Sequence, residues 1–180
     1  MRRSVFISAT TDGFSGWRDD IRKILERQGI EALVQDYFAP ELEHCQIEME
    51  RKISSASGVI CLVGPYYGAP MGAIPADGGV RMSYTQYEWT IAKKYDKPMC
   101  VYLIEDKFFS CGSPGAPQAG AQKKPNYPDS MHFDRSQKEF WELVSRDTET
   151  VNGHRRRIGT PVELALCLAM INWNIWPLQR

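Results

Sequence analysis

The sequence predicts an α/β fold, in which a parallel β-sheet carries helices on both of its faces. Short apolar runs alternate along the chain with segments whose apolar residues recur at helical spacing. Two of these runs, 59–63 and 99–104, are apolar at every position, as parallel strands covered on both faces require. Ser/Thr-x-x-Glu/Gln capping boxes mark helix starts after the apolar runs. Together these observations favour a sheet of parallel strands joined by helical crossovers.

The individual elements follow from this alternation. The expected strands are four apolar runs and a short edge strand, at 5–7, 30–34, 59–63, 99–104 and 156–158. The expected helices lie at 17–28, 40–53, 83–95, 136–144 and 160–173. Gly29 is expected to end the first helix. The order predicts a flavodoxin-like, three-layer α/β/α arrangement with a parallel sheet of four to five strands.

Helix starts and faces are the finest details that the pattern predicts. The polar segment 11–15, which contains Gly13, is expected to be a loop before the first helix. Capping boxes are expected to open the last three helices at Ser83, Ser136 and Thr160. The last helix is expected to pack through one apolar set: Val162, Ala165, Leu166, Ala169, Met170 and Trp173.

The whole chain, residues 1–180, is expected to form one domain without internal repeats. Two connections are unusually long. Residues 64–82 are rich in glycine and proline, and residues 105–131 form an insertion that carries four prolines.

Composition excludes several classes of function. The 22 basic and 22 acidic residues balance, so we expect neither a nucleic acid nor a membrane as partner. No apolar run is long enough for a bilayer span or a signal peptide, so a cytoplasmic location is expected. The five cysteines are scattered and the three histidines are dispersed, which favours free thiols and no metal. The short basic run 155–157 is interpreted as a loop or an edge strand.

Glu88 is the strongest candidate for a functional residue. In the helix 83–95 it lies on the stripe of Tyr84, Tyr87 and Ile91, a face that should be apolar. A carboxylate there is costly to bury unless it is paired, and its pKa should be raised. Such a group suits acid–base or ribose-binding work. The alternative is structural, with Glu88 hydrogen-bonded to backbone N–H groups of a neighbouring loop.

Loops at the carboxyl ends of the strands are expected to surround Glu88, because ligands bind there in open α/β sheets. Their distinctive residues are Ser8, Thr10, Asp12, Asp36, Tyr37, Phe38, Tyr66, Tyr67 and Gly68. The segment 64–68 lacks the signatures of a P-loop and of a Rossmann turn. It is interpreted as a turn whose tyrosines cover the sheet edge, or as one in which a tyrosine stacks on a ligand base.

Several short motifs resemble a TIR-like family, which is found at the N-termini of large NTPase and repeat proteins and in bacterial defence systems. The resemblance covers about residues 4–104. The matching segments are 5–10, 17–20, 36–38, 61–68, 83–88 and 97–98. The sequence departs from the family at Tyr84 and Thr85, where many TIR domains have a tryptophan–cysteine pair.

The resemblance implies a self-associating domain that cleaves the nicotinamide glycosidic bond of NAD+, as a hydrolase or cyclase in antiviral defence. Glu88, five residues after Ser83, matches the family's essential glutamate. It would bind the nicotinamide ribose and stabilise an oxocarbenium-like transition state. NAD+ would be the substrate, and no cofactor is expected. The expected substrate-binding residues are Ser8, Thr10, Asp36, Tyr37, Tyr67, Gly68, Ser83 and Tyr84.

Two other functions stay open. One is a non-catalytic, self-associating interaction module that works with a fused or separate sensor protein. The other is glycosyl transfer of the nucleoside deoxyribosyltransferase kind, which also uses a glutamate on a comparable helix.

Overall fold

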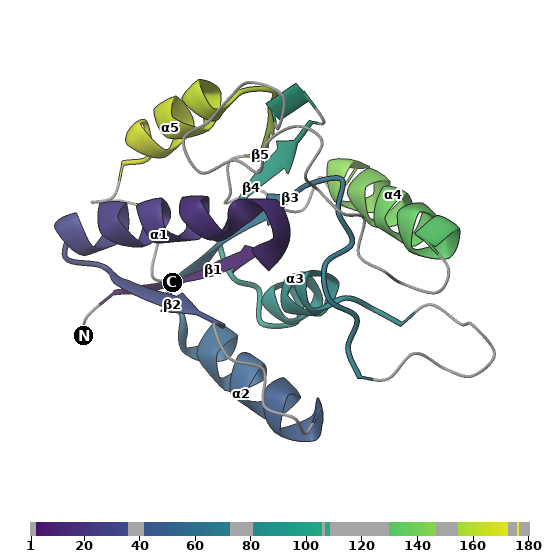
Figure 1. The fold of residues 1–180 in the computed structure, drawn as a ribbon. Helices are drawn as coiled ribbons and strands as arrows, with labels where there is room; N and C mark the ends of the chain where they lie inside the picture. Colours follow the sequence, from purple (N-terminus) through teal and green to yellow (C-terminus); the bar gives the residue numbers. More distant parts are fainter. Residues whose placement is uncertain are drawn as a thin grey trace.

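The computed structural model (Figure 1) describes residues 3–35, 42–72, 81–105, 107–108, 130–146, 155–172 and 176. The strands in this part of the chain are β1 (Ser4–Ala9), β2 (Glu31–Val34), β3 (Gly58–Val63), β4 (Met99–Ile104) and β5 (Arg155–Ile158). They form one sheet in the order β2-β1-β3-β4-β5, and every neighbouring pair is parallel. This is the flavodoxin-like order, so the predicted fold class is confirmed.

The described helices cover both faces of this sheet. They are α1 (Thr11–Arg27), α2 (Leu42–Ser55), α3 (Tyr84–Lys94), α4 (Ser130–Arg146) and α5 (Pro161–Ala169). Helices α1 and α5 pack on one face, and α2, α3 and α4 pack on the other (Figure 1). None of the described helices is long and apolar enough to cross a lipid bilayer.

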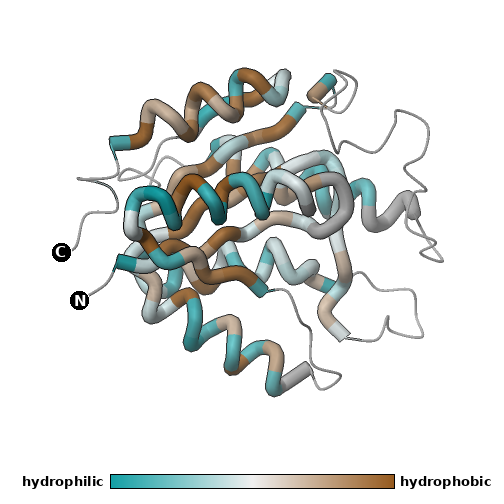
Figure 2. Tube along the Cα trace, turned by 60° about the vertical axis from the view of Figure 1, so that its left-hand side comes forward, coloured by the Kyte–Doolittle hydropathy of each residue, from teal (hydrophilic) through white to brown (hydrophobic). Residues whose placement is uncertain are grey.

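Two hydrophobic cores lie between these layers, because successive side chains of a strand point to opposite faces. On β1, Val5 and Ile7 join the core beneath α1 and α5, whereas Phe6 joins the core beneath α2, α3 and α4. Figure 2 shows strands that are largely hydrophobic and helices whose hydrophobicity alternates. The central strands β3 and β4 are buried at every position, as their uniform apolarity predicts.

The start of α1 differs from the prediction of a loop at 11–15. The helix begins at Thr11, directly after Thr10, whose extended backbone makes it the N-cap. Phe14 is fully buried, and its ring centroid lies 6.3 Å from that of Phe108. Packing of this one aromatic residue therefore outweighs the polar, glycine-containing sequence around it. The predicted end of the helix is confirmed, since Gly29 has a left-handed φ of 70°.

Two further helix predictions are wrong in part. Helix α4 begins at Ser130, so the capping box predicted at Ser136 lies inside the helix, and Glu139 pairs with Arg135 instead. On α5 the capping box of Thr160 and Glu163 is confirmed. Its packing face is not the predicted one, because Leu164 and Leu168 are buried. The five described members of the predicted set are all exposed: Val162, Ala165, Leu166, Ala169 and Met170. The sixth, Trp173, lies outside the described residues.

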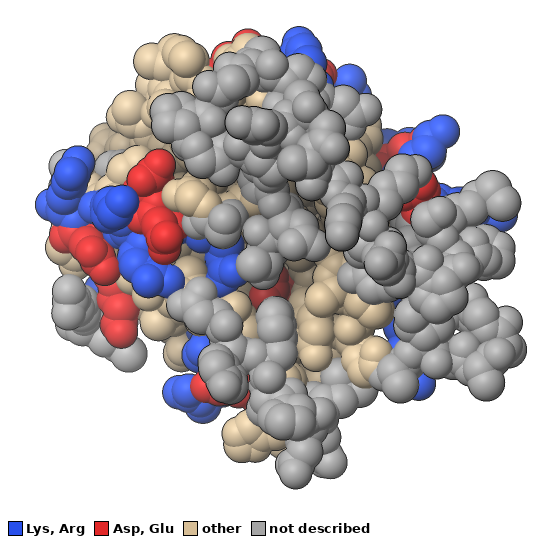
Figure 3. All heavy atoms as spheres, in the orientation of Figure 1, with Lys and Arg blue, Asp and Glu red and all other residues tan. Residues whose placement is uncertain are grey.

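Charged residues are interspersed on the surface. Figure 3 shows basic and acidic side chains side by side, with no broad patch of either sign among the coloured residues. Several of them form i,i+3 or i,i+4 pairs, such as Lys23 with Asp20 on α1. The basic run 155–157 lies on β5, the edge strand, where Arg157 covers the ring of Trp141.

Candidate functional site

Helix α3 places Glu88 against the carboxyl end of β1. The helix is fixed at its start by a complete capping box: Ser83 Oγ accepts from the Gln86 N–H, and Gln86 Oε1 accepts from the Ser83 N–H. Five residues on, the Glu88 side chain points inward and is only 5% exposed. A carboxylate in this position needs polar partners, and the neighbouring strands supply them.

Ser8 is the direct partner of Glu88. Its hydroxyl donates to Glu88 Oε2 at 2.6 Å, and Ser8 Oγ in turn accepts from the Cys61 thiol at 3.8 Å. Ser8 and Cys61 stand opposite each other in the register of β1 and β3. The sheet therefore holds a buried chain of three side chains that ends on the carboxylate.

Burial sets the protonation of these groups. It raises the pKa of the Glu88 carboxyl from 4.5 to about 7, against the opposing effects of the Ser8 hydrogen bond and of the charges on Arg18 and Lys52. Burial also raises the pKa of Cys61 to about 12, so Cys61 remains a thiol near neutral pH. Glu88 is thus poised to exchange a proton near neutrality, a property typical of functional carboxylates.

A pocket of about 140 Å³ opens beside Glu88. Thr10, Gly68, Tyr84 and Thr85 line it together with Glu88. Arg18 of α1 and Gln35, which follows β2, also line it. The pocket has the size of a sugar ring rather than of a whole dinucleotide, which would exceed it.

The basic residues near Glu88 are held by backbone and amide oxygens. Arg18 Nη2 donates to the Gln35 carbonyl oxygen at 3.0 Å, and Lys52 Nζ donates to Gln35 Oε1 at 3.0 Å and to the Val34 carbonyl oxygen at 3.2 Å. Both cations therefore have fixed positions next to a carboxylate whose ionised form they stabilise. The arrangement can hold a hydroxylated ring against a carboxylate of adjustable charge.

Gly68 brings the turn after β3 close to β1. Its φ is +79°, and a Cβ at this position would lie 2.7 Å from Thr10 Cγ2. A side chain cannot fit there without a shift of the turn or of Thr10. Glycine is therefore what allows these two pocket walls to meet.

The predicted site residues fall into three groups. Thr10, Gly68 and Tyr84 line the pocket with Glu88, whereas Ser8 bonds to Glu88 and Ser83 caps its helix. Tyr67 is buried but is not part of the lining. Asp36 and Tyr37 lie outside the described residues, as does Phe38.

Sequence reasoning missed Arg18, Gln35 and Thr85. Arg18 carried a usable signal: it lies on the stripe of Phe14, Ile21 and Leu25 and is 7% exposed. A charge on an apolar helix face was the signal that identified Glu88, but the expected loop at 11–15 hid this stripe. Gln35 and Thr85 have no comparable pattern.

Cysteines and possible metal ligands lie apart from one another in the described part of the chain. There, no three His, Cys, Asp or Glu residues gather in a way that could hold a metal ion. The described cysteines Cys45, Cys61, Cys100 and Cys167 are free thiols.

Comparison with known proteins identifies the family. The chain matches no curated protein. Among solved structures it is similar to the Clostridium botulinum CMP N-glycosidase BcmB, with 16% identity, a TM-score of 0.48, and coverage of 94% of this chain and 100% of that one. Residues 4–144 match the family model described as a domain of unknown function, DUF4062, and the chain belongs to this family.

Proposed function

We propose that the chain is a TIR-like domain that cleaves NAD+ at its nicotinamide glycosidic bond, by hydrolysis or cyclisation, in a signalling or antiviral defence role. The observation that carries the proposal is the buried Ser8–Glu88 pair at the mouth of a pocket of sugar-ring size. The motifs around Ser8, Gly68 and Glu88 that resemble TIR-like proteins support the same assignment.

The chemistry fits a carboxylate that acts in its ionised form. When the bond between the ribose C1′ and the nicotinamide nitrogen breaks, the electron pair leaves with the nicotinamide. The pyridinium thereby becomes a neutral molecule, so the leaving group needs no proton. Positive charge develops on the ribosyl ring, and the ionised carboxylate of Glu88 stabilises that charge. Water or a second group of the same nucleotide then bonds to C1′ through a lone pair, and the proton that it loses passes to solvent.

The neighbours of Glu88 suit this role. Arg18 and Lys52 favour the ionised carboxylate, and the Ser8 hydroxyl fixes one of its oxygens. The other oxygen is available to accept from a ribose hydroxyl in the pocket. A positively charged nicotinamide ring that enters would lower the pKa of Glu88 further.

The test is nicotinamide release from NAD+ by the purified protein, followed by chromatography. Glu88→Gln should reduce release by roughly 100-fold or more, the effect of losing a group that stabilises transition-state charge. Glu139→Gln, the same change at an exposed position of α4, should leave the rate unchanged. A rate that survives Glu88→Gln would contradict the role of Glu88.

Protein concentration is the second variable in this assay, because the resemblance also implies self-association. Specific activity that rises with protein concentration, together with a rise in mass by light scattering, would support assembly. Wild-type protein that releases no nicotinamide even when concentrated would favour a non-catalytic interaction module. Base exchange on deoxynucleosides would favour the glycosyl transferase instead.

A further inference from the structure

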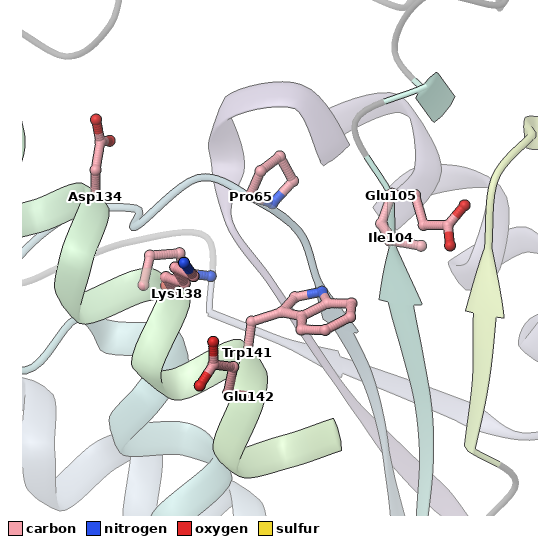
Figure 4. A pocket seen from close by; sticks show the side chains of 8 residues that line it. Pro65, Ile104, Glu105, Asp134, Lys138, Trp141 and Glu142 are labelled. Carbon is pink, nitrogen blue, oxygen red and sulfur yellow. The ribbon is translucent and has the colours of Figure 1, made fainter. Parts of the chain in front are cut away.

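A second and larger pocket lies at the carboxyl ends of β3 and β4. It has a volume of about 330 Å³, within the range of small-molecule sites. Pro65, which follows β3, and Ile104, which ends β4, form its apolar side (Figure 4). Helix α4 forms the other side. Of the residues described, none lines both this pocket and the pocket of Glu88.

Trp141 provides an aromatic wall. Figure 4 shows its indole reaching from α4 toward the end of β4. The guanidinium carbon of Arg157 lies 5.0 Å from the centroid of this ring and so already supplies a cation. A second cation would gain less from the ring and would meet repulsion from Arg157. An uncharged planar ring is therefore the ligand group that the indole favours.

Gln137 provides a polar group with a fixed orientation. It is 3% exposed, and its Nε2 donates to the Gly64 carbonyl oxygen at 2.7 Å. The carbonyl requires a donor, so the amide nitrogen must face Gly64 and Oε1 must face away. No donor to Oε1 exists within the described residues. A buried acceptor without a partner is costly, and a ligand N–H group would satisfy it.

Oε1 is itself covered in this structure, so a small movement of neighbouring pocket side chains must accompany binding. Rotamer changes of this size are common when ligands bind. Lys138, which follows Gln137 on α4 and also lines the pocket, is exposed and can make such a movement.

The rim of the pocket carries no strong net charge. Its charged lining residues are Glu105, Asp134, Glu142 and Lys138 (Figure 4). Lys107 and Arg146 pair with Glu105 and Glu142 from outside the lining, so three carboxylates stand against three cations. A ligand without net charge suits such a rim.

We propose that this pocket binds an uncharged, planar nitrogen heterocycle with an exocyclic amine, of the aminopurine class, as the nucleoside or free base. The ring stacks on Trp141, and the amine donates to Gln137 Oε1. The proposal stands apart from NAD+ cleavage at Glu88, since it rests on different residues.

The experiment is a calorimetric titration of the whole chain with adenosine. Trp141→Ala should weaken binding roughly tenfold, as expected for the loss of one base–aromatic stack. Trp141→Phe keeps an aromatic ring, so its affinity for adenosine should lie between those of the wild type and Trp141→Ala. Glu139→Gln, on the same helix but outside the lining, should bind like the wild type. Circular dichroism of each variant separates loss of the site from loss of the fold.

A ligand analogue tests the chemistry of the site. Purine riboside, which lacks the exocyclic amine, should bind several-fold more weakly because Gln137 then keeps no donor. The proposal is overturned if the wild type does not bind millimolar adenosine, if folded Trp141→Ala binds it equally well, or if purine riboside binds as tightly.

Discussion

Glu88 is held in a state that lowers the stability of the protein. Its pKa is 4.5 in the unfolded reference and about 7 in the folded protein, so the folded state binds the proton more tightly. Stability therefore falls as the pH rises from 4.5 to about 7 and stays lower above that range. The reduction is about 3 kcal/mol, a large share of the stability of a small domain. Retaining such a group is typical of a functional site.

Glu88→Gln should stabilise the protein, since the amide keeps the shape and an acceptor for Ser8 but carries no charge to bury. The gain should approach about 3 kcal/mol above the folded pKa and become small below the unfolded one. Thermal unfolding of both proteins across this pH range measures the difference. Glu139→Gln, where the carboxylate is exposed, should show no comparable pH dependence. A gain that does not change with pH would contradict the raised pKa.

Ser8→Ala should shift the pH dependence of NAD+ cleavage. The proposed activity requires ionised Glu88, so kcat/KM should rise with pH through about 7. Ser8 lowers the pKa of Glu88 by donating a hydrogen bond, and its removal should move the midpoint to higher pH. Ser54→Ala, at a half-buried serine of α2 whose hydroxyl donates to the Arg51 carbonyl oxygen, is the matched control and should leave the midpoint in place. An unchanged midpoint in Ser8→Ala would show that the hydrogen bond does not tune Glu88.

At the residue scale, a charge on an apolar helix face was the informative signal. It led to Glu88 because the capping box at Ser83 set the helix start, and hence the face, correctly. The same signal was present at Arg18 and was lost because the start of α1 was placed too late. Hydrogen bonds between distant residues, such as that of Ser8 with Glu88, have no local signature at all.

Among the described helices, α3 and α5 begin with capping boxes, and the cap of α3 is the one that bears on the site. Ser83→Ala removes the cap of α3 and should cost about 1 kcal/mol of stability. It should also reduce NAD+ cleavage, because the first turn of α3 positions Glu88. Thr160→Ala removes the equivalent cap of α5 and should cost a similar amount without affecting cleavage. Denaturant unfolding and the nicotinamide assay together distinguish the two; equal activity of both variants would contradict a positioning role for the cap.

Two glycines, Gly68 in the turn after β3 and Gly29 in the turn after α1, allow a matched pair of alanine substitutions. Gly68 and Gly29 both have left-handed φ values, +79° and +70°, so alanine strains both by about 1 kcal/mol. Only at Gly68 does the added Cβ also meet Thr10, at 2.7 Å from its Cγ2, whereas nothing lies within 4 Å at Gly29. Gly68→Ala should therefore lower both the stability of the protein and its rate of NAD+ cleavage. Gly29→Ala should lower the stability alone. Full activity of Gly68→Ala would mean that Thr10 can move away from residue 68 without an effect on NAD+ cleavage.

Helices and strands could be predicted where their local sequence alone determines their bounds. The strands β3 and β4 are apolar throughout, and the starts of α3 and α5 are marked by capping boxes that the structure contains. Predictions were wrong where tertiary packing decides. Burial of Phe14 extends α1 toward β1, and the continuing helix overrides a box-like pattern at Ser136. The buried face of α5 is set by how the helix meets β5, which its local sequence does not reveal.

At the scale of the whole molecule, the order of elements predicted the sheet. Alternating strands and helices leave few parallel arrangements, and the flavodoxin-like order is among the commonest. The same order brings the loops after β1 and β3 together and so assembles the pocket of Glu88. The expectation of one domain over residues 1–180 stays a prediction. Most of the expected insertion at 105–131 lies outside the described residues.

The position of each strand in the sheet should also determine how the protein opens. Strands β1, β3 and β4 have a partner on both sides, whereas β2 and β5 lie at the edges. Every residue of β3 and β4 is buried, but β2 is largely half-buried and begins with an exposed residue. Amide protons of the three inner strands should therefore exchange only through global unfolding, and those of β2 and β5 through local opening.

Native-state hydrogen exchange, followed by mass spectrometry in low denaturant, measures this ranking. Opening free energies of β1, β3 and β4 should converge on the global value, and those of β2 and β5 should be smaller and less sensitive to denaturant. Because Glu88 bonds to β1 and not to an edge strand, the Ser8–Glu88 pair should persist while the edges open. Edge strands as protected as β3 would contradict this ranking, because they would mean that the sheet opens as one unit.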